Sequence, residues 1–265
     1  MKSTSAEIYV FSGTGNTFLL VDSIKDIFTS NNCPTMIHPI PGKFYPPAED
    51  SLLGLAFTTA WFSSYPFVLD FIKKLPEGNG REVFLVSSMA GSNFNMSQPI
   101  RKLLIKKGYN PIGSRVVKMP SNYGKSPSEK SISNQELIKA ATVQAANYAG
   151  QLLTGKSKWP ENKAPWSTFF YKFAQTKYPW AIFRNLFGLQ INISRCSKCG
   201  FCQSICPVGA IDRNNNTYTI TDKCVSCQHC AAFCPEKAIG IGGEGGNAYK
   251  TFEYKKMLEL FRNEK

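Results

Sequence analysis

Two stretches of the chain share one spacing of cysteine and proline: CSKCGFCQSICP at residues 196–207 and CVSCQHCAAFCP at residues 224–235. In each, three cysteines are separated by two residues, and a fourth cysteine followed by proline comes after three more. This is the ligand spacing of paired cubane [4Fe–4S] clusters, in which the fourth cysteine of each run completes the other cluster. The runs hold eight of the nine cysteines, and Cys33 stands alone. We therefore expect two [4Fe–4S] clusters in this part of the chain.

The spacing also predicts which sulfur atoms bind each cluster. The predicted ligands of the first cluster are Cys196, Cys199, Cys202 and Cys234. The predicted ligands of the second cluster are Cys224, Cys227, Cys230 and Cys206. Zinc is a weaker alternative, because a structural zinc site usually takes its ligands as two separated pairs. Disulfides are also weaker, because they need an oxidising compartment and the first residues show no signal-peptide pattern.

A second informative stretch lies near the start, where the apolar strand EIYVF (residues 7–11) runs into the loop SGTGNT and then an apolar helical segment. Backbone N–H groups and the helix dipole converge at such a loop and make it an anion site. The loop has no lysine for a nucleotide P-loop, and Phe18 stands where a dinucleotide fingerprint has its third glycine. These exclusions favour an FMN phosphate site. Its predicted residues are Ser12, Gly13, Thr14, Gly15, Asn16 and Thr17.

Further apolar runs indicate how this loop is built into a domain. Strands are predicted at about 35–40, 52–58, 82–88 and 114–119, with helices between them. Alternating strands and helices predict a doubly wound parallel sheet, whose ligands bind beyond the carboxyl ends of the strands. The last helix of this domain begins at the capping box of Ser133 and Glu136 and is expected to close at Gly155.

Together these motifs resemble the flavodoxin–ferredoxin fusion proteins of anaerobes. The likeness rests on SGTGNT, on the aromatic loop after the third strand, on MPSNY (residues 119–123) and on the two Cys-Pro runs. It implies a flavodoxin-like sheet of order 2-1-3-4-5 with FMN, followed by a small α+β ferredoxin-like domain with two [4Fe–4S] clusters. It further implies that Trp61 and the 88–92 loop flank the isoalloxazine ring and that Tyr123 closes over it. Beyond the first loop, the implied FMN contacts are Thr59, Ala60, Trp61, Phe62, Ser88, Met89, Ala90, Gly91 and Tyr123.

Composition divides the chain into four predicted segments. The FMN domain is expected at 1–155, a linker at 156–190, the ferredoxin domain at 191–245 and a C-terminal helix at 246–265. The linker interleaves aromatic and basic residues, which predicts two short amphipathic helices at about 167–177 and 180–187. Its simplest role is an apolar strip that packs one domain on the other. A partner-docking face and peripheral membrane contact are less favoured alternatives.

Charge and composition restrict the classes of molecule that this protein is expected to bind. The formal charge is +13, and two clusters with thiolate ligands would lower it to about +9. This favours an acidic redox partner, whereas no nucleic-acid recognition motif accompanies the charge. No apolar run is long enough to cross a bilayer. We expect a cytoplasmic protein in a reducing, oxygen-poor setting, and the sequence leaves the oligomeric state open.

Three functions follow from these expectations. The first is a carrier that passes electrons between two clusters and FMN for redox partners. The second is an FMN-dependent reductase of a small substrate, although the flavin loops lack an obvious general acid. The third is a ferredoxin whose flavodoxin-like domain holds no FMN and serves for docking.

Overall fold

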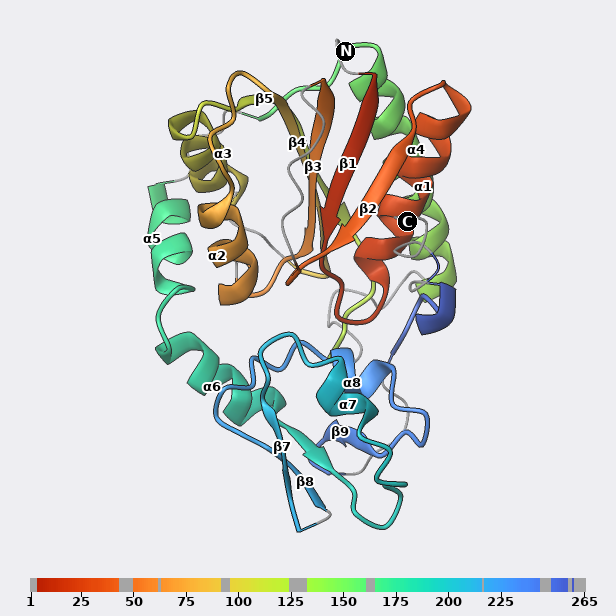
Figure 1. The fold of residues 1–265 in the computed structure, drawn as a ribbon, viewed down its shortest axis with the longest axis vertical. Helices are drawn as coiled ribbons and strands as arrows, with labels where there is room; N and C mark the ends of the chain where they lie inside the picture. Colours follow the sequence, from red (N-terminus) through yellow and green to blue (C-terminus); the bar gives the residue numbers. More distant parts are fainter. Residues whose placement is uncertain are drawn as a thin grey trace.

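Five parallel strands form the main sheet, in the order β2-β1-β3-β4-β5 (Figure 1). This confirms the predicted order 2-1-3-4-5, which is the flavodoxin-like form of a doubly wound sheet. The fifth strand begins four residues before the predicted start, because Asn110 already pairs with Glu82. Pro111 is tolerated there because β5 is an edge strand. The strands are β1 Ser5–Val10, β2 Thr35–Pro39, β3 Ser51–Thr58, β4 Glu82–Met89 and β5 Asn110–Lys118.

The structure is a computed structural model that describes residues 4–42, 50–61, 63–91, 96–123, 133–160, 165–215, 217–243, 249–256 and 259. None of the helices within these ranges combines the length and the apolar character of a membrane span.

Helices cover both faces of the sheet. Helices α1 (Asn16–Ser30) and α4 (Asn134–Leu153) lie on one face, and α2 (Pro66–Lys74) and α3 (Ser97–Lys106) on the other (Figure 1). Strand β3 is buried along its whole length, as expected when both faces are covered. The capping box of Ser133 and Glu136 is confirmed, and α4 ends at Leu153.

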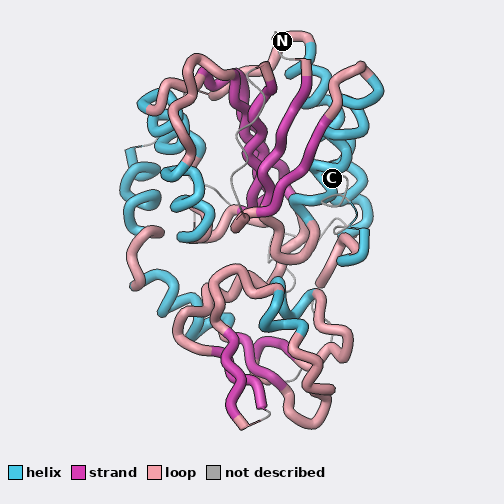
Figure 2. Tube along the Cα trace, in the orientation of Figure 1, coloured by secondary structure: helices cyan, strands magenta, loops and turns pink. Residues whose placement is uncertain are grey.

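Two short helices connect the sheet domain to the smaller domain. They are α5 (Pro165–Phe173) and α6 (Tyr178–Phe187), close to the helices predicted from the aromatic and basic pattern. Figure 2 shows the smaller domain beyond the carboxyl ends of the strands, with short strands and single-turn helices. Its elements are β6 Leu189–Ile191, α7 Phe201–Ser204, β7 Ile211–Asn214, β8 Thr217–Ile220, α8 His229–Ala232 and β9 Ile239–Ile241.

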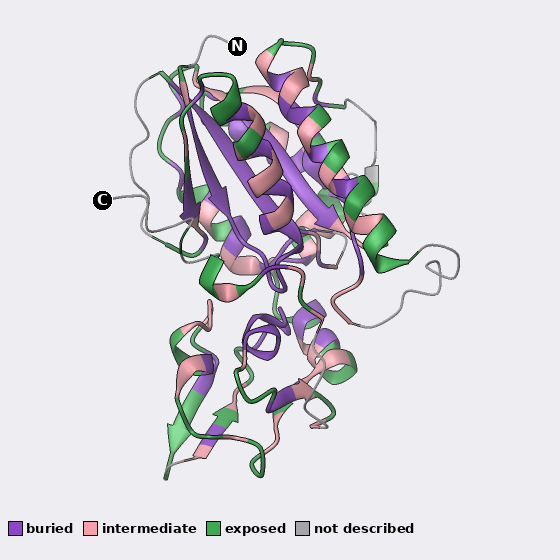
Figure 3. Ribbon diagram, turned by 90° about the vertical axis from the view of Figure 1, so that its right-hand side faces the viewer, coloured by how far each residue is buried: buried purple, intermediate pink, exposed green. Residues whose placement is uncertain are grey.

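Two antiparallel strand pairs, β6–β9 and β7–β8, frame this α+β unit. The second pair forms a hairpin that turns after Asn214. In Figure 3 the central strand β3 of the main sheet is buried, whereas most of β7 is exposed.

The hydrophobic core on the α2–α3 face continues into the smaller domain. Leu69 and Ile100 belong to the same buried cluster as Trp180 and Phe183 of α6 and Cys227 of the second cysteine run. The aromatic segment thus packs one domain against the other, which was the simplest of the roles predicted for it.

Candidate iron–sulfur centre and its junction with the sheet edge

Cysteines from both runs line each of two small cavities in the smaller domain. The first cavity is lined by Cys196, Cys199, Cys202 and Cys234. The second cavity is lined by Cys206, Cys224, Cys227 and Cys230. Each set contains three cysteines of one run and the fourth cysteine of the other. The structure therefore brings together the two crossed sets that the spacing predicts.

The two runs repeat the same backbone conformation 28 residues apart. Lys198 has a φ of 60° and its counterpart Ser226 a φ of 50°, and Gly200 and Gln228 form a second left-handed pair with φ of 76° and 66°. A left-handed residue inside each Cys-x-x-Cys segment bends the chain into a tight turn. A single-turn helix, α7 or α8, follows each turn. Local backbone geometry alone therefore groups three sulfurs of each run.

The fourth sulfur of each run also repeats its environment. The backbone N–H of Ala210 donates to Cys206 Sγ at 3.2 Å, and that of Ala238 donates to Cys234 Sγ at 3.3 Å. Hydrogen bonds to ligand sulfur are one means by which a protein tunes the potential of an iron–sulfur cluster. Both crossing cysteines are thus held with a donor at the sulfur.

Burial controls the protonation of these thiols. Burial, reinforced by neighbouring cysteines, raises the pKa of Cys202 to about 11. Burial and the nearby sulfurs also raise the pKa of Cys230 well above its usual range. These thiols therefore hold their protons at neutral pH unless a cation compensates the thiolate, as a metal centre does.

The two cysteine sets differ in solvent exposure and in which part of the molecule they lie against. Cys199 of the first set is exposed, whereas Cys224, Cys227 and Cys230 of the second are buried. The second set lies toward the sheet domain, because Cys227 belongs to the shared core. Arg184 of α6 donates from Nη1 to the carbonyl oxygen of Cys224 at 3.1 Å and ties the linker to this set.

The loop after β1, predicted to hold a phosphate, lies against the second cysteine run. His229 Nδ1 is 3.1 Å from the carbonyl oxygen of Ser12 and 3.2 Å from that of Gly13. Both oxygens accept, so Nδ1 carries the hydrogen. A Cβ atom on Gly13 would overlap the carbonyl oxygen of Cys227. Glycine at this position therefore permits close approach of the two domains.

A segment near the C-terminus covers another side of the same loop. The N–H of Thr251 donates to the carbonyl oxygen of Thr14 at 2.9 Å, and the Tyr249 hydroxyl donates to Asn16 Oδ1 at 2.9 Å. Phe252 stacks on Phe18 with ring centroids 5.9 Å apart. This segment covers the sheet domain, although most of the predicted C-terminal helix lies outside the described residues.

The polar groups of this loop are paired within the protein. The N–H groups of Gly15 and Thr17 both donate to Ser12 Oγ, at 3.0 and 3.1 Å. Thr14 Oγ1 donates to Asn122 Oδ1 at 2.7 Å, and Thr17 Oγ1 lies 2.9 Å from Ser88 Oγ. Two of the amides and the three hydroxyls predicted for phosphate binding therefore already have protein partners.

A side chain of α6 lies between the aromatic residues predicted to surround a flavin ring. Phe183 makes edge-to-face contacts with Trp61, at 5.8 Å between centroids, and with Tyr123, at 5.1 Å. Tyr123 is further held by its hydroxyl, which donates to the carbonyl oxygen of Ser226 at 2.9 Å. Phe183 thus contacts both rings and is itself buried.

The remaining space at this sheet edge is small. A cavity of about 50 Å³ is lined by Thr59, Ser88, Met89, Ala90 and Tyr123, among others. The predicted loops thus converge, but ligand sites for molecules of FMN size are of the order of several hundred Å³. The other predicted contacts lie as follows: Ala60 bridges to Ser63, Gly91 is exposed, and Phe62 is outside the described residues. In this arrangement the described residues do not fit FMN.

Three residues at the junction were not predicted as site residues: Phe183, His229 and Phe252. The sequence does contain one signal for His229, because this residue occupies the position in the second run that Phe201 occupies in the first. A polar ring in an otherwise apolar repeat position is the signal that could have pointed to it. Phe183 and Phe252 carry no such signal, since they are aromatic residues on amphipathic segments.

Comparisons with known proteins gave one family match and several similar solved structures. Residues 195–239 match the 4Fe-4S dicluster domain family. A search of curated proteins found no match. Similar solved structures include the flavodoxin of Streptococcus pneumoniae TIGR4, at 15% identity over 56% of this chain and 98% of the other, with a TM-score of 0.38. Megasphaera elsdenii flavodoxin is another, at 24% identity over 52% and 98%, with a TM-score of 0.36.

The sheet order and the domain match lead to one conclusion about architecture. The dicluster domain supports a role in electron transfer. The chain joins a flavodoxin-like α/β domain to a 4Fe-4S dicluster domain, as the resemblance implied.

Proposed function

We propose that this protein transfers electrons one at a time on two [4Fe–4S] clusters bound by the two crossed cysteine sets. The observation that supports this most directly is the composition of the two cavities. Each combines three cysteines of one run with the fourth of the other, although the two runs are separated by 16 residues of chain. Such crossing is the ligand pattern of two-cluster ferredoxins.

The exposure of the two sets suggests the direction from which a partner approaches. The first set includes the exposed Cys199, and Arg195, Lys198 and Lys237 are exposed beside its members in sequence. Positive side chains around an accessible centre attract an acidic protein and speed its encounter. We therefore propose that an acidic redox partner exchanges electrons with the first cluster. The second cluster would then lie between the first cluster and the sheet domain.

We infer that the flavodoxin-like domain binds no FMN and serves as a docking domain for the part of the chain that holds the clusters. Phe183 between Trp61 and Tyr123 favours this, as do the paired polar groups of the loop after β1. The earlier expectation of FMN as electron partner would require α6 to leave its place. The packing of Phe183 among the described residues also counts against the reductase alternative, which needs an accessible flavin.

Protein purified without oxygen tests both parts. Iron and acid-labile sulfide should each reach about eight per chain, and the reduced protein should show the EPR spectrum of two interacting [4Fe–4S] clusters. Stoichiometric zinc in place of iron would overturn the two-cluster proposal. Dialysis against excess FMN should leave no bound flavin. One FMN retained per chain would overturn the docking role and restore FMN as the electron partner.

A further inference from the structure

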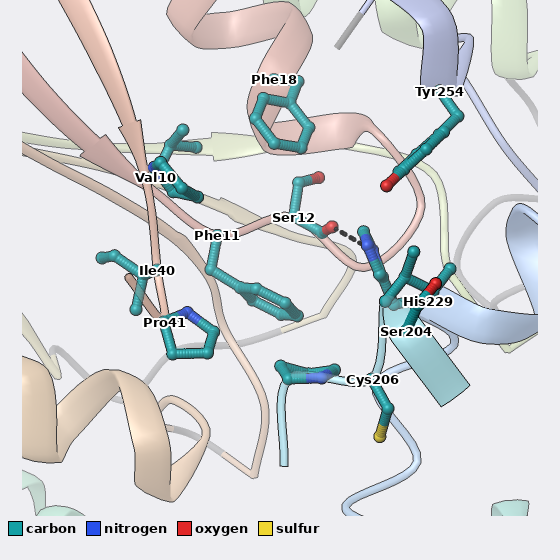
Figure 4. A pocket seen from close by; sticks show the side chains of 13 residues that line it. Val10, Phe11, Ser12, Phe18, Ile40, Pro41, Ser204, Cys206, His229 and Tyr254 are labelled. Atoms are coloured by element: carbon teal, nitrogen blue, oxygen red, sulfur yellow. Dashed lines mark hydrogen bonds between the residues drawn. The ribbon is translucent and has the colours of Figure 1, made fainter. Parts of the chain in front are cut away.

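A cavity of another kind lies at the seam between the two domains. Its volume is about 280 Å³. One wall is formed by residues at the ends of β1 and β2, and the opposite wall by residues 204–207 and His229 (Figure 4). Tyr254 completes the lining. Domain interfaces are a common location for small-molecule sites, and none of the proposed roles of the clusters uses this space.

The lining restricts the ligand to an uncharged molecule. Apolar side chains dominate it, including Val10, Phe11, Phe18 and Ile40, all of them buried. The described wall contains no aspartate, glutamate, lysine or arginine. An ionised ligand would therefore lose its hydration without gaining a countercharge, which is costly.

The rings in the wall favour a flat aromatic ligand. The Phe11 and His229 rings lie 6.0 Å apart, and the Tyr254 ring lies 6.5 Å from that of His229. Aromatic rings at such spacings offer stacked and edge-to-face contacts to a third ring. An apolar cavity of about 150 Å³ accommodates benzene. A volume nearly twice as large corresponds to one or two fused rings.

His229 supplies the polar anchor. The residue is about nine-tenths buried, with a relative exposure of 9%, and its Nδ1 is engaged by the carbonyl oxygens of Ser12 and Gly13. Nε2 has no hydrogen-bond partner among the described residues. Because Nδ1 carries the hydrogen, Nε2 is an acceptor. A ligand that presents an O–H or N–H group would satisfy it.

We propose that this seam cavity binds a neutral aromatic molecule of one or two fused rings that donates one hydrogen bond to His229. The site adjoins the second cluster's predicted position, because Cys206 lines both this cavity and the second cysteine cavity. In Figure 4 the sulfur of Cys206 points away from the other labelled side chains. The binding itself does not require the clusters to be redox-active.

Isothermal titration of the iron-loaded protein with 1-naphthol and 1-methoxynaphthalene at pH 7.5 tests the proposal. The two probes share their rings, but only the naphthol has a hydrogen to donate. We expect saturable binding of 1-naphthol and roughly two- to tenfold weaker binding of the methoxy compound, which is the usual size of one hydrogen bond. In His229→Phe this preference should vanish. Absence of saturable binding up to millimolar 1-naphthol would overturn the proposal.

Two filling variants locate the site. Ser204→Trp places a large ring at an exposed position of the cavity rim, and Ile40→Trp fills its buried floor. Either substitution should abolish binding. If Ile40→Trp fails to fold, Ser204→Trp still tests the site, because it leaves the core untouched. The control is Ile105→Trp on α3, where the isoleucine is 47% exposed. Equal binding by the control and both filling variants would place the ligand elsewhere and refute the assignment.

Discussion

The two cysteine cavities and the sheet edge were both predicted as sites from short motifs, but they differ in whether the folded chain leaves space for a cofactor. At each cysteine cavity, three cysteines close in sequence join a fourth from the other run, and the two runs repeat one backbone conformation. At the sheet edge, the predicted residues also converge, but the chain itself fills the space through Phe183 and pairs the loop through Ser12. A sequence motif therefore predicts the geometry of its own loop better than it predicts how much space for a ligand remains next to that loop.

The largest expected effect concerns the crossing of the cysteines. Replacement of Cys206 by serine should remove or destabilise the second cluster and leave the first, because Cys206 lines the cavity of the second set. Iron content should fall toward half, and the EPR spectrum should reduce to that of one isolated cluster. The matched variant Cys234→Ser should spare the second cluster instead. Selective loss of the first cluster in Cys206→Ser would contradict the crossed assignment.

Removal of the Phe183 side chain should lower the stability of the protein and open space at the sheet edge. Truncation of this buried ring to alanine removes its contacts with Trp61 and Tyr123 and should lower the free energy of unfolding by about 3 kcal/mol. Anaerobic urea unfolding followed by tryptophan fluorescence measures the change. We also expect FMN to bind this variant more tightly than the parent protein, since space opens between the two rings.

The control for that experiment is Phe169→Ala on α5, where the ring is 55% exposed. Its free energy of unfolding should change by less than about 0.5 kcal/mol, and its affinity for FMN should match that of the parent. Equal FMN affinity in all three proteins would show that Phe183 does not control access to the edge.

Gly13→Ala probes the contact between the loop after β1 and the second cysteine run. The added Cβ would overlap the carbonyl oxygen of Cys227, so we expect a loss of about 2 kcal/mol and faster hydrogen exchange in residues 12–17. The matched control is Gly150→Ala in α4, where nothing lies within 4 Å of the new atom. There alanine should stabilise the helix by up to about 1 kcal/mol. Unchanged exchange in Gly13→Ala would argue against close docking of the domains.

The smallest effect concerns the charges near the first cysteine set. The double variant Lys198→Glu, Lys237→Glu should slow reduction by anionic dithionite and speed reduction by cationic reduced methyl viologen, each by roughly threefold at low salt. Stopped-flow absorbance of the clusters gives both rates, and high salt should erase the difference. Lys139→Glu, on the exposed surface of α4, serves as control. The same response from the control would mean that net charge, not local charge, sets the rates.

Much of the architecture was predictable because its causes are local. Strand and helix alternation predicted a parallel sheet, and family resemblance supplied its order, which the structure confirms. The capping box of Ser133 and Glu136 was also found. In each case the signal lies within a few neighbouring residues, since capping, turn formation and periodic burial act over that range.

What the sequence determined by itself is the cysteine chemistry, because the spacing of eight thiols sets which sulfurs can bind the same cluster. Tertiary structure alone decided what covers the sheet edge. Phe183, His229 and Phe252 reach that edge from segments far along the chain, and their contacts depend on how two domains dock. Periodicity reports that a side chain is buried, but it does not report against which surface, because packing between distant segments leaves no local pattern.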